Sequence, residues 1–275
     1  MAQQAQTWVL ESDYHCGSAT GLWSQSESFT RNPIQVELHK RRDDAIEWFG
    51  ERPDVVVVNG DGTDGEDPKG RDVIDADPDH QAESVAINAA DWNAKTEYII
   101  VAGTRYHETS DGWPTGKRVC DKIKLICHAR GQHKIKVSYA RKLNTTINGW
   151  FRLQARHKIG RSVVPYGRNT SPVRSKVWSV LNAALQSAVR GKAARWPHLL
   201  LFSHVHYWLF QQSSWGAVAV TPCWQAIGSR YGDEECDGQI DLGCFKLTVG
   251  AKESDGWRLE HRVYPAGLVD RLERR

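Results

Sequence analysis

The sequence predicts a single α/β domain of stacked layers, with its functional residues at one edge of a sheet. Short runs of β-branched and other apolar residues alternate with amphipathic stretches of helical spacing, as in sheets covered by helices. The apolar runs end in turns that carry glycine, aspartate or histidine. No internal repeat or linker divides the 275 residues, which are enough to bury a substantial core.

The first third of the chain contains three of these strands and two helices. Four consecutive valines at 55–58 follow Pro53 and are typical of a strand covered on both faces. The amphipathic stretch at 34–49 is followed by Gly50, a residue common just after a helix. The predicted order is a strand from residue 8, a helix at 34–49, a strand at 55–58, a helix at 83–95 and a strand at 98–102.

Side chains able to bind a metal follow the ends of these strands. Asp13 and His15 come after the first strand, Asp61 lies in a glycine-rich turn after the second, and His107 follows the third. In an extended backbone, residues i and i+2 project from the same face, so Asp13 and His15 can converge on one point. An oxygen beside an imidazole nitrogen can form half of a divalent metal site. Taken alone, the pair is equally typical of a solvated turn.

The remaining residues add further strands and one long helix. A leucine-rich run at 197–202 is followed by His204 and His206, again two apart, and the alternating stretch at 150–157 ends on His157. Pro172 lies in the first turn of a helical pattern that extends to residue 189. Further strands are predicted at 134–139 and, as antiparallel segments, at 216–221, 244–249 and 257–263.

Charge is strongly segregated along the chain. Residues 1–116 contain 9 Lys and Arg against 22 Asp and Glu, whereas residues 117–176 contain 16 against 1. The basic segment suits a polyanion or phosphate partner, or it packs beside the acidic third within the fold. One domain is predicted over 1–275, with an acidic, turn-rich insertion loop at 66–82 and a charged tail at 264–275.

The composition favours a cytosolic protein, made in a bacterium or in a phage-infected host. The longest apolar runs are far shorter than the roughly 18 residues of a membrane helix, and the N-terminus lacks the features of a signal peptide. The six cysteines form no C-x-x-C pair and are expected to be free thiols. Zinc binding by Cys120, Cys127, His128 and His133 is an alternative, although their spacing matches no common zinc motif.

In order, the motifs of this chain resemble those of the calcineurin-like metallophosphoesterase superfamily. That family carries Asp-x-His, Gly-Asp, Gly-Asn-His, a lone His and Gly-His-x-His. The matching segments span most of the chain, and they are Asp13-Tyr14-His15, Gly60-Asp61, Gly103-Thr104 with His107, His157, and Ser203-His204-Val205-His206. The resemblance implies a four-layer α/β/β/α sandwich that holds two divalent metal ions, with manganese preferred and iron or zinc as alternatives.

The family pattern also implies a role for each matching residue. Asp13, His15 and His206 would bind one metal, and Asp61 would bridge to a second metal bound by His157 and His204. His107 resembles the catalytic imidazole that protonates the leaving oxygen. Thr104 stands where the family has a metal-binding Asn, and its spacing to His107 resembles a Gly-Thr-x-x-His form of phage-encoded members. Whether Thr104, a water or His107 completes the second metal site is left open, and His133 competes with His157.

These motifs predict an enzyme that hydrolyses phosphodiester bonds by attack of a metal-activated water. The partner expected is a phosphoester substrate, with nucleic acid as the first candidate. Arg161 and Arg168 are candidate phosphate-binding residues, or equally cations that stabilise the fold by facing the acidic first third. A phosphomonoesterase or cyclic-nucleotide phosphodiesterase is the alternative within this class. A catalytically inactive nucleic-acid-binding protein that keeps the metals for stability is the alternative from another class. The sequence gives no oligomeric state.

Overall fold

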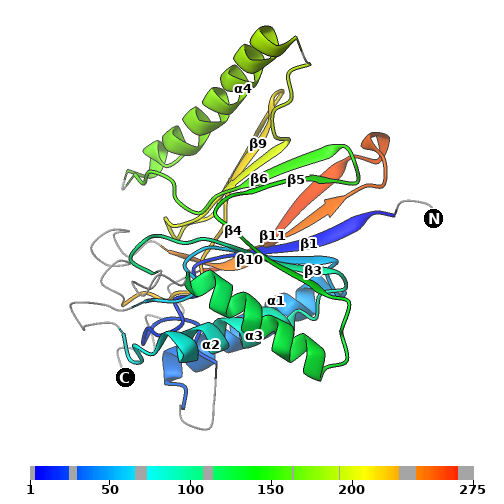
Figure 1. Cartoon of the computed structure of the whole chain (residues 1–275). Coiled ribbons are helices and arrows are strands. Elements are labelled where there is room, and N and C mark those ends of the chain that lie inside the picture. Colours follow the sequence, from blue (N-terminus) through cyan, green and yellow to red (C-terminus); the bar gives the residue numbers. More distant parts are fainter. Residues whose placement is uncertain are drawn as a thin grey trace.

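In the computed structural model of the chain, two β-sheets pack face to face and helices cover both outer faces (Figure 1). Helices α1, α2 and α3 lie on one side and α4 lies on the other, so the predicted four-layer α/β/β/α sandwich is confirmed. The structure describes residues 4–24, 30–65, 73–107, 114–162, 164–191, 193–228 and 240–265. Parts of the predicted insertion loop (66–72) and of the predicted tail (266–275) lie outside the described residues.

The first sheet has six strands in the order β11-β10-β1-β2-β3-β4. Strands β1 to β4 run parallel, whereas β10 pairs antiparallel with both β1 and β11. Both faces are buried: Val56 and Val58 pack toward the helices, while Val55 and Val57 pack toward the second sheet. The strands are β1 Gln6–Glu11, β2 Val55–Asn59, β3 Glu97–Val101, β4 Lys136–Ala140, β10 Asp241–Val249 and β11 Trp257–Pro265.

The second sheet has five strands in the order β5-β6-β7-β9-β8. Strand β9 runs parallel to β7, so the prediction of an antiparallel strand at 216–221 is right only for its pairing with β8. Leu199 and Leu201 of β7 face the first sheet, and Leu200 and Phe202 face α4. The strands are β5 Leu143–Ile147, β6 Phe151–Ala155, β7 Leu199–Phe202, β8 Leu209–Ser213 and β9 Gly216–Val220.

The three helices beside the first sheet are α1 Pro33–Phe49, α2 Pro78–Asp91 and α3 Thr115–Ala129. Asn32 and Gln35 form a capping box at the start of α1, and Gly50 ends the helix in the left-handed conformation. Helix α2 begins at Pro78 rather than at residue 83, because the Asp77 side chain accepts hydrogen bonds from the first free backbone N–H groups. The end of the predicted acidic loop is therefore helical.

Part of the basic segment packs beside the acidic third. Two cations of α3 and the residue that follows this helix form ion pairs with carboxylates of α2: Arg118 with Asp79 at 2.9 Å, Lys122 with Glu83 at 3.6 Å and Arg130 with Asp91 at 3.8 Å. These cations are therefore compensated within the fold. The basic residues that follow β4 and β6 lie elsewhere, as described below.

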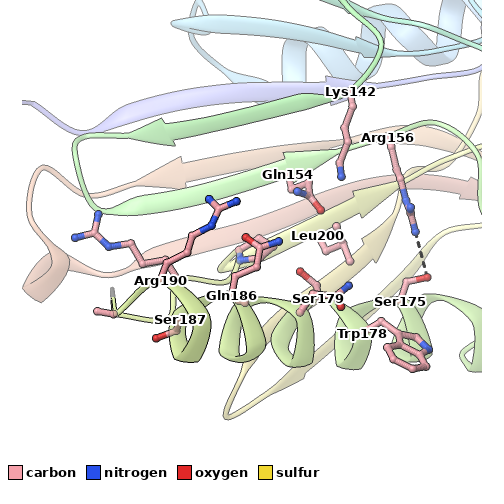
Figure 2. A pocket seen from close by; sticks show the side chains of 15 residues that line it. Lys142, Gln154, Arg156, Ser175, Trp178, Ser179, Gln186, Ser187, Arg190 and Leu200 are labelled. Carbon is pink, nitrogen blue, oxygen red and sulfur yellow. Dashed lines mark hydrogen bonds between the residues drawn. The ribbon is translucent and has the colours of Figure 1, made fainter.

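Helix α4, Thr170–Arg190, covers the second sheet loosely. Only Pro172 and Lys176 of its 21 residues are buried. Figure 2 shows Ser179 and Gln186 on the side of the helix that faces the strands, across an open space. Among the described residues, no helix has both the length and the apolar character that crossing a membrane requires.

A buried polar network fixes the end of β1. The carboxylate of Glu11, which is fully buried, accepts hydrogen bonds from the indole Nε1 atoms of Trp92 at 2.6 Å and Trp224 at 2.8 Å, and from the hydroxyl of Tyr14. The buried guanidinium of Arg42 lies 3.4 Å from it. The charge is thus paired and hydrogen-bonded, as a buried charge must be. This network positions the backbone two residues before the first predicted ligand.

Candidate metal centre

The carboxyl ends of β1 and β2 place the first two motifs side by side. The backbone N–H of Asp13 donates to the Gly60 carbonyl, and that of His15 donates to the Asp61 carbonyl, each at 3.1 Å. From the second sheet, the backbone N–H of His204 donates to Oδ2 of Asp13 at 3.3 Å. Motifs separated by nearly 200 residues therefore meet at one edge of the two sheets.

The backbone at these motifs is left-handed, and not extended as predicted. Seven described residues other than glycine have a positive φ, and five of them are predicted ligands: Asp13 (53°), His15 (47°), Asp61 (44°), His204 (79°) and His206 (55°). This conformation is unfavourable for residues with a side chain and is concentrated at functional sites. The side chains converge because the chain turns sharply after each strand, and not because alternate residues of a strand share a face.

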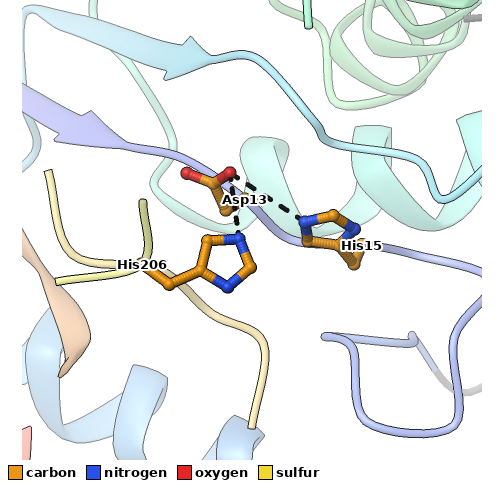
Figure 3. A group of neighbouring side chains, drawn as sticks. All are labelled: Asp13, His15 and His206. Atoms are coloured by element: carbon orange, nitrogen blue, oxygen red, sulfur yellow. Dashed lines mark ion pairs between the residues drawn. The ribbon is translucent and has the colours of Figure 1, made fainter. Parts of the chain in front are cut away.

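The first ligand group contains Asp13, His15 and His206, all buried (Figure 3). Oδ1 of Asp13 lies 3.4 Å from Nε2 of His206 and 3.9 Å from Nε2 of His15. The three candidate ligand atoms lie within 4.8 Å of one another. This spacing suits one oxygen and two nitrogen ligands around a single ion.

The second ligand group contains Asp61, His157 and His204. Oδ2 of Asp61 lies 2.8 Å from Nε2 of His157 and 3.8 Å from Nδ1 of His204. Nε2 of His157 also lies 3.8 Å from Oδ1 of Asp13, so the two groups adjoin. Two adjoining groups of possible ligands, each with a carboxylate, therefore lie at this edge, and the binding of two metal ions there stays a prediction.

Backbone and carboxylate oxygens orient the histidine rings. Nδ1 of His157 lies 2.7 Å from the Asn59 carbonyl, which leaves Nε2 facing Asp61. Nδ1 of His15 lies 2.8 Å from Oδ1 of Asp64, which leaves Nε2 facing the first ligand group. Such partners fix the tautomer of a metal-binding imidazole and raise its basicity.

Asp64 was not among the predicted site residues, although it lies three residues after Asp61 in the same glycine-rich turn. With His15 and His107 it forms a third group of possible ligands. Its contact with Nδ1 of His15, however, uses the ring nitrogen that points away from the first ligand group. We therefore interpret Asp64 as a positioning residue for His15.

One observation that does not depend on the motifs indicates that the site suits a metal ion. Oδ1 of Asp13 and Nε2 of His15 are buried and have no hydrogen-bond partner, although buried polar atoms are normally paired. Both atoms are good ligands for a divalent ion and face the same point. Carboxylate and imidazole donors suit manganese, iron or zinc, whereas calcium prefers oxygen ligands alone.

The carboxylates and imidazoles of the site shift one another's pKa values. Burial opposes ionisation of Asp13, but His157 and His206 bring the pKa of this carboxyl down to about 2. Burial likewise opposes ionisation of Asp61, and His157 and His107 hold its pKa well below the usual range. Burial alone would lower the pKa of His157, but the carboxylates of Asp61 and Asp13 raise it to about 9. The metal-free centre therefore holds two carboxylates and at least one proton near neutral pH.

Metal binding should therefore release protons. A ligating imidazole must be neutral, and below pH 9 a metal ion must displace the proton of His157. We expect metal affinity to rise with pH, by about tenfold per unit, and to level off above pH 9. Isothermal titration calorimetry of manganese at pH 7 in buffers of different ionisation enthalpy should report at least one proton released per chain. Equal heats in all buffers would be inconsistent with this protonation state.

Removing the carboxylate that orients His15 should weaken metal binding without disrupting the fold. For Asp64→Asn we expect metal affinity to fall about 10- to 100-fold, because the Nδ1 contact of His15 loses its charge. Metal titration followed by intrinsic fluorescence measures this effect. The matched control is Asp75→Asn, which alters a carboxylate 3.0 Å from the exposed His80 ring. Equal affinities for the two variants would rule out the positioning role of Asp64.

Thr104 and His107 lie beside Asp61 of the second ligand group. Thr104 donates its backbone N–H to Oδ1 of Asp61 at 2.6 Å, and its hydroxyl lies 3.3 Å from both carboxylate oxygens. Nε2 of His107 lies 3.8 Å from Oδ2 of Asp61, while its Nδ1 lies 2.8 Å from the Asp64 carbonyl. Thr104 thus acts here as a hydrogen-bond donor to the predicted bridging carboxylate.

The predicted phosphate-binding arginines have other surroundings. The guanidinium of Arg168 lies 4.6 Å from the centre of the Tyr207 ring, and Arg161 is exposed. A cleft of about 1100 Å³ beside His157 is lined instead by four other cations, Arg105, Arg141, Arg156 and Lys158. The sequence identified only the basic segment 117–176, which contains Arg141, Arg156 and Lys158. The individual residues could not be selected, because single cations on separate turns form no recognisable motif.

The two-sheet sandwich is the fold that the resemblance to the calcineurin-like metallophosphoesterases implied, and residues of all five motifs lie together at one edge of it. The Gly-Thr-x-x-His variant of phage-encoded members stays a prediction. The described residues also contain three groups of possible metal ligands, and none of them includes Cys120, Cys127, His128 or His133.

Solved structures similar to this chain include an archaeal phosphodiesterase, Vps29 of Cryptosporidium parvum and the phosphoesterase YfcE of E. coli. The archaeal enzyme is 12% identical, with a TM-score of 0.41, and the alignment covers 93% of this chain and 99% of that chain. Vps29 is 11% identical (TM-score 0.43; coverage 95% and 99%). YfcE is 10% identical (TM-score 0.40; coverage 94% and 99%). No family model and no curated protein sequence matches the chain.

Proposed function

We propose that this protein is a metal-dependent hydrolase of phosphodiester bonds. The observation that carries the proposal is the pair of adjoining ligand groups around Asp13 and Asp61, at the side of a cleft lined by cations. The ligand groups supply sites for two ions, and the cations supply contacts for a phosphate. A site with this combination is suited to phosphoryl transfer.

Asp13, His15 and His206 would bind one ion, and Asp61, His157 and His204 would bind the second. Bound there, two divalent ions would stabilise charge on phosphoryl oxygens and lower the pKa of a water molecule. Thr104 fixes the orientation of the Asp61 carboxylate through its backbone N–H. His157 and His15 are held by oxygens on the opposite side of their rings, so their Nε2 atoms stay directed at the centre.

His107 is the residue placed to donate a proton. Burial would lower its pKa, but Asp61 and Asp64 raise it above its ordinary value, so the ring tends to carry the proton that a general acid must give. Its side chain is 24% exposed, whereas that of His157 is 2% exposed. His107 can therefore meet a substrate and protonate the departing oxygen.

The surrounding cations favour a diester with further phosphates over an isolated monoester. Arg105, Arg141, Arg156 and Lys158 line the cleft beside the centre, and none of the described residues that line it is a carboxylate. Such a field attracts a substrate with several negative charges. Nucleic acid is the substrate class that combines a diester bond with repeated phosphates.

The test is hydrolysis by the purified protein loaded with manganese. We expect cleavage of bis(p-nitrophenyl) phosphate and of DNA or RNA, and loss of both activities after treatment with a chelator. Zinc- and iron-loaded samples compare the alternative metals. Cleavage of p-nitrophenyl phosphate without cleavage of any diester would replace the proposal with a phosphomonoesterase.

A further inference from the structure

A second cleft, of about 550 Å³, lies between helix α4 and the second sheet. In Figure 2, Lys142, Gln154 and Arg156 project from the sheet side, and Trp178 and Arg190 project from α4. We call this cleft the α4 groove. It shares Arg156 and Ser175 with the cleft beside His157, so the two clefts adjoin.

Helix α4 turns a polar side toward the sheet and apolar residues toward solvent, which is the reverse of an ordinary surface helix. Its lining residues Ser175, Ser179, Asn182 and Gln186 recur at helical spacing and face the groove. On the outer side Val177, Leu181 and Leu185 are 44%, 43% and 56% exposed. A helix that packs on its sheet turns its apolar side inward. The inner side of α4 is instead built from hydroxyl and amide groups, which suit a polar ligand.

The groove is basic and its charges are uncompensated. Its cations are Lys142, Arg156, Arg190 and Arg195, and the described residues that line this groove and the neighbouring cleft include no aspartate or glutamate. Across the described ranges of the chain, none of these four cations forms a salt bridge. Burial lowers the pKa of Lys142, and the positive charge of Arg156 lowers it further. Like charges gathered without carboxylates are stabilised by a ligand that brings several negative charges.

We propose that the α4 groove binds a single strand of nucleic acid and leads it to the metal centre. Repeated cations contact successive phosphates, amide and hydroxyl groups contact sugars and bases, and Trp178, which is 55% exposed, offers a surface for stacking. A groove between a helix and a sheet encloses a single chain, whereas an anionic membrane needs a convex or flat surface. This proposal rests on the proposed function, because it names the substrate class of the same site.

The proposal is tested by binding in the absence of metal, so that the result does not depend on hydrolysis. The probe is a fluorescein-labelled oligo(dT) 12-mer, followed by fluorescence anisotropy in EDTA over a range of salt concentrations. The groove variant is Lys142→Ala/Arg190→Ala. The matched control is Lys40→Ala/Lys136→Ala, which removes two cations whose side chains are 77% and 71% exposed on other elements.

We expect the groove variant to bind the strand at least tenfold more weakly than the control. Its slope of log affinity against log salt should fall by about 1.4, since each lost phosphate contact accounts for about 0.7 in a single strand. Trp178→Ala should weaken binding at least fivefold with an unchanged salt slope, because stacking is lost and charge is kept.

Three outcomes would overturn the proposal: no binding by the unmodified protein, equal binding by the groove and control variants, or preferential binding of a poly-glutamate peptide. None of them bears on hydrolysis of bis(p-nitrophenyl) phosphate, which tests the proposed function separately. Conversely, a protein that binds the strand through the groove but cleaves no diester would retain this inference and lose the proposed function.

Discussion

Replacing His107 by alanine should lower the kcat for a diester substrate by about 10²- to 10⁴-fold, the usual contribution of a general acid. Metal content should stay that of the unmodified protein, because Asp61 keeps its contacts with His157, His204 and Thr104. Hydrolysis of bis(p-nitrophenyl) phosphate and elemental analysis of the same samples measure the two quantities. The alkaline limb of the pH profile, where a general acid loses its proton, identifies the lost group.

The control for this variant is His133→Ala, which removes an exposed histidine whose ring packs against His128 at 4.3 Å. We expect its kcat to equal that of the unmodified protein. Loss of bound metal in His107→Ala would assign His107 to the ligands instead. If the unmodified protein hydrolyses no diester but binds nucleic acid without metal, the result would favour the alternative of an inactive nucleic-acid-binding protein.

The Arg42→Ala variant should destabilise the fold by about 3–5 kcal/mol, the cost of leaving one partner of a buried ion pair alone. Arg42 is 1% exposed and lies 3.4 Å from the fully buried carboxylate of Glu11. Its guanidinium also lies over the rings of Tyr14 and Trp92. Because the Glu11 network fixes the end of β1, metal affinity should fall as well. Urea denaturation measures the change in the free energy of unfolding.

The neighbouring Arg41 provides the control on the same helix. It pairs with Glu37 one turn away at 2.7 Å, and its side chain is 22% exposed. For Arg41→Ala we expect a loss of only about 0.5 kcal/mol, as for other helix-surface pairs. Similar losses for the two variants would mean that the buried network contributes little to stability.

The predictable part of this fold consists of strands whose sequence is apolar throughout. The valines of β2 and the leucines of β7 are buried on both faces, and such runs show their type and their ends plainly. Strands β5 and β8 were not assigned individually, because their sequences, LNTTI and LFQQS, are mostly polar. Their pairing is decided by neighbouring strands that lie far away in the sequence.

The candidate site was predictable in its residues and not in its geometry. Strand ends identified Asp13, Asp61 and the histidine pair, but left-handed backbone at these positions depends on tertiary contacts that outweigh the local preference. Asp64 could have been suspected from its place in the glycine-rich turn. Its role follows only from its contact with His15, which the sequence does not show. The helix that became α4 was predicted from the spacing of its apolar positions, but several of these residues face solvent, because tertiary packing decides which side of a helix faces the sheet.

Elemental analysis of Asp13→Asn after saturation with manganese and gel filtration bears on the whole arrangement at once. Asp13 contributes to the first ligand group, and its Oδ1 lies 3.8 Å from His157 of the second. We expect two manganese ions per chain in the unmodified protein and at most one in the variant, with diester hydrolysis lost. A variant that keeps two ions and full activity would show that Asp13 and His15 do not form one side of a metal centre.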